Sequence, residues 1–250
     1  MVVYFAQALA IYEHLEKDSL HAAHARHVVA DILYKSGNYA EAVREYTSIT
    51  SNREYLNNFS NSYDVQTNLM TCHYYLKNFE DAVEIGMNLT RSLSDDGPKL
   101  FTVLENIGKI YISMTDLDKS VEYYEKAISL AINLGLHEKE LDAYIHLSQA
   151  YLGANALGKV VETLNMLYEK ACEYGLHISR YAAYAFFNRG VIIARYNNDI
   201  EGGINDIENA IAIREQTHDE LKESDLEEYR QILDEVIAYT GYSDKEDSED

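Results

Sequence analysis

The stretch LENIGKIYISMTDLDKSVEYYEKAISLAINLG, from Leu104 to Gly135, predicts two helices joined by a short turn. Apolar or small residues recur every three or four positions in each half, so each helix has one apolar face. They are Leu104, Ile107, Gly108 and Tyr111 in the first half and Val121, Tyr124, Ala127 and Ile128 in the second. Asp116 marks the break, and Gly135 suits a left-handed cap at the end of the second helix. The stretch is therefore expected to form a helical hairpin.

The same hairpin pattern recurs along the chain. Small or β-branched residues at one equivalent position of the second helix are 40, 38, 40 and 43 residues apart, at Ala42, Ala82, Ser120, Val160 and Gly203. We expect a single all-α domain over 1–240, with hairpins at about 20–51, 63–94, 98–135, 138–175 and 180–216. A helix at 225–239 would cap the stack, and 241–250 would form an acidic disordered tail.

Two details depart from this pattern. Residues 1–17 match the second helix of a hairpin whose first helix is missing, so the apolar residues Val2, Phe5 and Leu9 would be uncovered. A second copy of the chain could cover them and form a symmetric homodimer. In the second full hairpin, Gly86 stands where an aromatic residue is expected, which predicts a looser contact there.

The order of residues in the quoted stretch resembles the tetratricopeptide repeat (TPR). Leu104, Ile107-Gly108, Tyr111, Tyr124 and Ala127 follow the family pattern, although Leu104 replaces the common Trp, and Ser120 the usual Ala. The resemblance implies a right-handed α-α superhelix of about five hairpins with a C-terminal capping helix. The long repeats resemble those of bacterial signalling regulators and kinesin light chains.

The TPR resemblance also implies where a ligand would bind, because the first helices of TPR hairpins line a concave groove. Asn68, Asn106 and, less closely, Asn188 fall at one recurring groove position, where an amide side chain can bond both the C=O and the N–H of an extended peptide. Flanking groove positions are Asp31, Tyr34, Thr71, Tyr75, Glu105, Lys109, His146, Gln149 and Tyr184. The alternative is that the asparagines only bond a neighbouring helix.

Composition and charge restrict the function. The formal net charge of -21 and the pI near 4.7 argue against a nucleic-acid surface and favour basic or neutral partners. No run approaches the roughly 20 apolar residues of a membrane span, and no signal peptide is recognisable, so we expect a cytoplasmic protein. Cys72 and Cys172 are predicted to be buried hydrophobic residues rather than a disulfide pair.

Metal binding and catalysis have little support in the sequence. His21, His24 and His27 lie three residues apart, with Asp31 one turn on, but a strong metal site needs more fixed ligands, and helix-surface spacing is the alternative. The Lys, Arg and Asn clamp with which chaperone-binding TPRs hold a carboxylate is not matched, because His27, Asp31 and Glu105 stand there. There is no phosphate loop or nucleophile motif, so no cofactor and no enzymatic activity are expected.

Two functional hypotheses follow. The first is a non-enzymatic scaffold that binds a peptide or protein segment in the groove, where Asn68, Asn106 and Asn188 fix the ligand backbone. The second is a peptide- or ligand-sensing module of a larger bacterial signalling or transcription-regulating protein.

Overall fold

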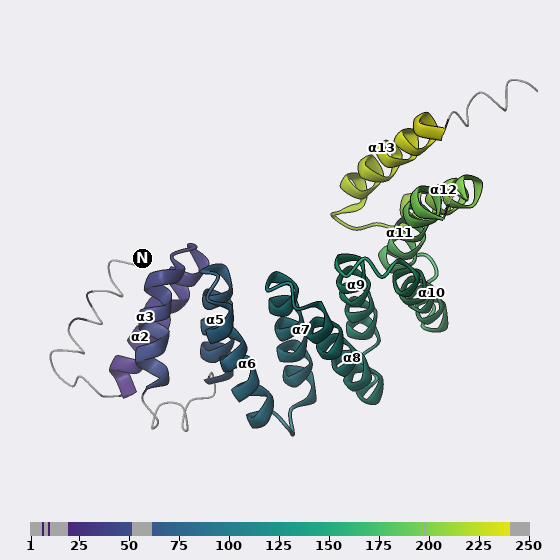
Figure 1. The fold of residues 1–250 in the computed structure, drawn as a ribbon. Coiled ribbons are helices and arrows are strands. Elements are labelled where there is room, and N and C mark those ends of the chain that lie inside the picture. Colours follow the sequence, from purple (N-terminus) through teal and green to yellow (C-terminus); the bar gives the residue numbers. More distant parts are fainter. Residues whose placement is uncertain (1–6, 8–9, 11–19, 52–61, 198, 241–250) are drawn as a thin grey trace, which may run out of the picture. The chain divides into compact units, whose positions relative to one another are not determined.

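The computed structural model of the chain describes residues 7, 10, 20–51, 62–197 and 199–240 (Figure 1). Over these residues it contains eleven α-helices and no strand. Contacts divide the chain into two units, Met1–Asp116 and Leu117–Asp250, which are described separately. Apart from positions 7 and 10, the expected half repeat 1–17 lies outside the described residues, as does the expected tail 241–250.

The first unit is a series of helices that pack on their neighbours in the sequence. The helices are α2 (Leu20–Lys35), α3 (Tyr39–Thr50), α5 (Ser62–Tyr75), α6 (Phe79–Ser92) and α7 (Gly97–Ser113). Each contacts the next, and α2 also contacts α5, the first helix of the following hairpin. The apolar faces of α2, α3 and α5 meet in one core that includes Ala30, Tyr46 and Leu69.

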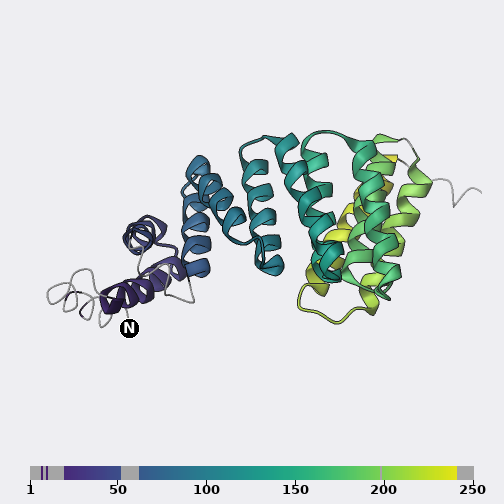
Figure 2. The same ribbon diagram turned by 90° about the horizontal axis from the view of Figure 1, so that it is seen from below.

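The second unit repeats this arrangement. Its helices are α8 (Leu117–Leu134), α9 (His137–Gly153), α10 (Leu157–Glu173), α11 (Arg180–Tyr196), α12 (Ile200–Gln216) and α13 (Lys222–Thr240). Each packs on the next, and α11 also contacts α9 and α13 (Figure 2). Helix α13 buries Leu226, Tyr229 and Val236, and the Tyr229 ring stacks on Phe187 of α11 with centroids 4.0 Å apart. None of the helices in the described part of the chain is long and apolar enough to cross a membrane.

One turn geometry recurs between the helices. A residue with positive φ follows α2, α5, α7 and α9; these residues are Gly37, Lys77, Thr115 and Asn155. At Lys77, the Lys77 N–H donates to Tyr74 O at 3.0 Å and the Asn78 N–H donates to His73 O at 2.9 Å, so carbonyls at the helix end are satisfied. Gly135 and Gly175 end α8 and α10 in the same way, which confirms the cap predicted at Gly135.

The prediction of a loose contact at Gly86 is wrong. Gly86 is buried, and a Cβ there would lie 2.7 Å from Cγ1 of Ile107 and 3.1 Å from Sδ of Met70. The missing side chain allows α6 to approach its neighbours closely, so the space is filled from α5 and α7. The prediction for Cys172 is also wrong: Cys72 is buried, but Cys172 is exposed. Ala171 occupies the buried face of α10, so the next residue along the helix, Cys172, points away from that face.

The last hairpin depends on two glycines and a partly buried ion pair. A Cβ on Gly190 of α11 would lie 2.7 Å from the backbone oxygen of Gly203 on α12, so only glycines permit this approach. Arg189 precedes Gly190, where the repeat at Ile107-Gly108 has an apolar residue before the glycine. It donates from Nε and Nη2 to the two oxygens of Asp206, at 2.7 and 2.8 Å, and from Nη1 to Asn165 at 2.6 Å. A bidentate pair replaces apolar packing there.

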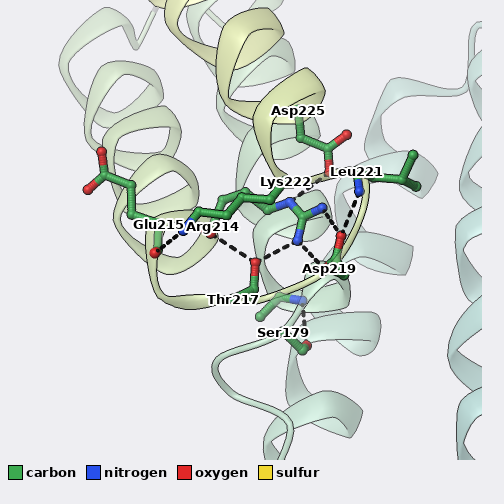
Figure 3. A network of polar contacts seen from close by, with 9 residues as sticks. Ser179, Arg214, Glu215, Thr217, Asp219, Leu221, Lys222 and Asp225 are labelled. Carbon is green, nitrogen blue, oxygen red and sulfur yellow. Dashed lines mark hydrogen bonds and ion pairs between the residues drawn. The ribbon is translucent and has the colours of Figure 1, made fainter.

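The loop before α13 is held by Arg214, whose side chain is fully buried (Figure 3). Its guanidinium donates from Nε to Asp225 at 2.7 Å, from Nη1 to Thr217 at 2.6 Å, and from both Nη atoms to the two oxygens of Asp219. Because Arg214 lies on α12 and Asp225 on α13, one cation joins the two helices and the loop between them.

The hydrogen bonds from Arg214 lower the pKa of Asp219 to about 2. This pKa is therefore lower in the folded chain than the value of about 3.9 of an unperturbed aspartate. The pairing contributes stability above a pH of about 4 and loses that contribution as the pH falls through about 2.

We predict that Gly203→Ala destabilises the chain by about 1–3 kcal/mol, because its Cβ would lie 2.7 Å from Gly190 O and from Ala194 N, and backbone cannot yield cheaply. Gly158→Ala is the matched control, since a Cβ there meets nothing within 4 Å. Urea denaturation followed by circular dichroism should show a lower midpoint for Gly203→Ala only. Equal midpoints would contradict the close approach.

We also predict that Arg214→Met costs about 2–3 kcal/mol, because it removes the buried partner of two partly exposed carboxylates. Arg230→Met is the control: Arg230 pairs with Glu215 at 2.7 Å, but both side chains are more than half exposed, so its loss should cost less than about 1 kcal/mol. Thermal unfolding of the two variants tests the difference. A similar loss in both would show that Arg214 does not hold α13.

Candidate functional site

The predicted groove residues lie on the first helices of the hairpins. Asp31 and Tyr34 are on α2; Asn68, Thr71 and Tyr75 on α5; Glu105, Asn106 and Lys109 on α7; His146 and Gln149 on α9; and Tyr184 and Asn188 on α11. Two cavities in the structure lie along these helices, one within each unit. They gather some of the predicted residues and leave out others.

Asn68 belongs to a polar cluster inside the first unit. The buried Tyr46 donates its hydroxyl proton to Oδ1 of Asp31 at 2.6 Å, and Nδ2 of Asn68 donates to the same oxygen at 3.3 Å and to the Tyr46 hydroxyl at 3.2 Å. Burial, followed by the hydrogen bond to Asp31, raises the pKa of Tyr46. The amide N–H groups of Asn68 therefore join α5 to α2 and α3.

The first cavity has a volume of about 40 Å³ and lies along α5 and α7. It is lined by Met70, Thr71, Tyr74, Tyr75, Asn106, Lys109 and Ile110. The structure thus brings together four predicted residues, Thr71, Tyr75, Asn106 and Lys109. No hydrogen bond of the Asn106 amide to another described residue is found, in contrast to Asn68.

Aromatic rings support the rim of the first cavity. The Tyr75 ring is stacked on Tyr39 of α3, with centroids 4.6 Å apart and an interplanar angle of 10°, and meets Tyr74 edge-on at 5.4 Å. Nζ of Lys109 lies 5.4 Å from the centroid of the Tyr74 ring. Tyr75 nevertheless remains 52% exposed, so a fixed aromatic surface faces solvent.

The second cavity, of about 140 Å³, lies along α9 and α11. It is lined by Ser148, Gln149, Leu152, Val160, Tyr184, Asn188, Val191, Ile192, Arg195 and Tyr196. Of the predicted residues it contains Gln149, Tyr184 and Asn188. The apolar rim of this cavity, Leu152 and Tyr196, was not predicted; these side chains are 47% and 62% exposed. The sequence signal that could have indicated them is a large apolar residue in the last turn of the first helix of a hairpin.

Polar groups of the second cavity are engaged within the unit. Nε2 of Gln149 donates to the Tyr184 hydroxyl at 3.4 Å, and Nδ2 of Asn188 donates to Tyr184 O at 2.9 Å. Nη2 of Arg195 donates to Glu235 of α13 at 3.2 Å. The surface that is left for a ligand is therefore mainly apolar.

Several predicted residues line neither cavity. Tyr34 packs against the core of the first unit, Asp31 is in the Tyr46 cluster, and Glu105 is partly buried on α7. The His146 ring stacks on Tyr124 at 5.5 Å.

Two of the three histidines of α2, His24 and His27, have side chains that the structure describes. His24 is exposed, while His27 is buried with Nε2 3.5 Å from Oδ2 of Asp31; the side chain of His21 lies outside the described residues. Among the described residues, no three His, Cys, Asp or Glu side chains gather closely enough to hold a metal ion.

Residues 7–164 match a family described as a family of unknown function, DUF5588, and the chain belongs to this family. No curated protein matches the sequence.

Several solved structures are similar in fold. BtubC (BKLC) from P. vanneervenii is 17% identical with a TM-score of 0.63, over 85% of this chain and 84% of that one. YrrB, a TPR protein with an unusual peptide-binding site, is 15% identical with a TM-score of 0.51, over 84% and 93%. A STAND protein with a TPR sensor, from Pyrococcus horikoshii, is 16% identical with a TM-score of 0.61, over 90% and 38%. These likenesses confirm the TPR solenoid fold.

The geometry predicts that the asparagines contribute differently to stability. Asn68→Ala removes donors to Asp31 and Tyr46 and should cost about 1 kcal/mol of unfolding free energy. Asn106→Ala, which removes no such bond, should stay within about 0.5 kcal/mol of the unchanged chain. Urea denaturation of the full chain measures both. Equal losses would mean that Asn106 is also part of the folded framework.

Proposed function

We propose that this chain, a member of a family of unknown function, is a non-enzymatic scaffold that binds an extended segment of a partner protein on the first helices of its hairpins. The observation that carries the proposal is the repetition of a cavity at one place in the repeat. Counted back from the turn residues Lys77 and Asn155, Thr71 and Gln149 occupy the same position, and both line a cavity.

The linings are suited to a polypeptide. Asn106 offers an amide group that can bond a peptide backbone, and Tyr75, Leu152 and Tyr196 offer exposed apolar surface for side chains. The net charge of -21 favours a segment that is neutral or basic overall. The fold of YrrB, which has a peptide-binding site, is compatible with this use.

A second candidate is supported by the likeness to the STAND sensor. The similarity covers 90% of this chain but 38% of that protein, so a chain of this size can serve as the sensor part of a larger signalling protein. The native transcript discriminates between the candidates: an output domain encoded in the same reading frame favours the sensor, and its absence favours the scaffold.

We predict that short random peptides displayed on phage are enriched by the full chain and bind along the first helices. For peptides held at the first cavity, calorimetry should show that Asn106→Ala weakens binding by about 1–2 kcal/mol, the cost of a lost hydrogen bond in a desolvated site. For peptides held at the second cavity, Tyr184→Ala should weaken binding by at least as much, because it removes contact area.

Asn133→Ala is the control, because Asn133 is exposed on α8, a second helix, and lines neither cavity. If no peptide is enriched, or if every enriched peptide binds equally well to both cavity variants, the proposed function is wrong.

A further inference from the structure

We propose that the first cavity recognises a side-chain carboxylate, an Asp or Glu within the bound segment. This inference rests on the proposed function and specifies the ligand chemistry of its first site. Among the described residues, the lining contains one cation, Lys109, together with the amide of Asn106 and no Asp or Glu. The described lining therefore carries a positive formal charge in a chain whose net charge is -21.

Lys109 differs from its closest counterpart on the same helix. Lys99 and Lys109 both lie on α7, and each has its Nζ 5.4 Å from the centroid of a tyrosine ring. Lys99 also pairs with Asp96, with Nζ 2.7 Å from Oδ2. No ion pair of Lys109 is found among the described residues, so its ammonium donors remain available to a ligand.

Other donors lie beside Lys109. Asn106 precedes it by three residues, which places the two side chains on one face of α7. Across the cavity, the Tyr74 hydroxyl lies 3.3 Å from Oγ of Ser113, which can give its single proton to Tyr74 or to Lys109 O, so the Tyr74 proton can turn to a ligand. An ammonium, an amide N–H and a phenolic O–H around one small space match the lone pairs of a carboxylate.

The size of the cavity agrees with this chemistry. About 15 Å³ of such volume holds one water molecule, so the first cavity, at about 40 Å³, fits a carboxylate but no large side chain. The second cavity is about 140 Å³, and its Arg195 is already paired with Glu235. The clamp of chaperone-binding TPRs holds a C-terminal carboxylate with both Lys and Arg. In the described part of the chain, the first cavity offers Lys109 alone, which favours a side-chain carboxylate over a C-terminal one. Because the net negative charge of the chain repels acidic segments, we expect the bound segment to contain few Asp or Glu residues.

The test uses short random peptides displayed through their C-termini, so that every peptide carboxylate is a side chain. Selections are run on the full chain, on Lys109→Met and on Lys99→Met. We expect Asp or Glu to be enriched at one peptide position with the unchanged chain and with Lys99→Met, but not with Lys109→Met. A selected peptide is then synthesised with an amidated C-terminus, together with its Glu→Gln or Asp→Asn analogue.

Lys109→Met and the Glu→Gln or Asp→Asn peptide should each raise Kd by roughly ten- to a hundredfold, the effect of one charge-assisted hydrogen bond. Because both changes remove the same interaction, combining them should raise Kd little more than either change alone. Lys109→Glu should regain binding when the peptide acid is replaced by lysine. A peptide without the side-chain acid should bind no better when its C-terminus is a free acid. Stronger binding of that peptide would overturn the assignment to a side chain.

The remaining outcomes separate the two proposals. In one, the selected peptides lose affinity with Asn106→Ala and yet carry no preferred acid, or bind Lys109→Met and Lys99→Met equally well. Either result would overturn the carboxylate site and leave the proposed function standing. Selections that yield no peptide sensitive to Asn106→Ala or Tyr184→Ala would overturn both. Circular dichroism of each variant checks that the fold is intact.

Discussion

No helix of this chain can bury its apolar face alone, and this constraint governs the rest of the structure. Each amphipathic helix must be covered by its neighbours in the sequence, so the connections have to return the chain at a fixed angle. The left-handed turn residues at Gly37, Lys77 and Asn155 achieve this within the units, and Thr115 ends α7 with the same backbone geometry. Only Gly37 is free of the strain that a side chain adds at positive φ, so packing must stabilise the other three.

Close approach between helices has two different solutions in the two units. In the first unit, Gly86 admits side chains of neighbouring helices, namely Ile107 and Met70. In the second unit, Gly190 and Gly203 bring two backbones together, and ion pairs at Arg189 and Arg214 surround that tight region. Such pairs are costly to desolvate, so they stabilise only because nearly every donor has a partner.

The two cavities show how one repeat position can acquire different chemistry. Thr71 and Gln149 are equivalent, yet the first cavity is small and lined by a lysine that has no ion pair among the described residues. The second cavity is larger and apolar at its rim, and its polar groups are engaged within the unit. A solenoid separates such sites because each hairpin contacts only its neighbours. The side chains of one cavity can therefore change without affecting the other.

The sequence by itself determined the helical hairpins and their spacing, because apolar periodicity and turn residues are local properties of the chain. The resemblance of the sequence to the TPR pattern implied which helices carry the candidate site. It placed Thr71, Tyr75, Asn106 and Lys109 on first helices, but it treated Asn68 and Asn106 as equivalent. Only the tertiary structure decided that Asn68 bonds Asp31 and Tyr46 while Asn106 lines a cavity. Hydrogen-bond partners and cavities are formed by residues distant in the sequence, so no local pattern contains them.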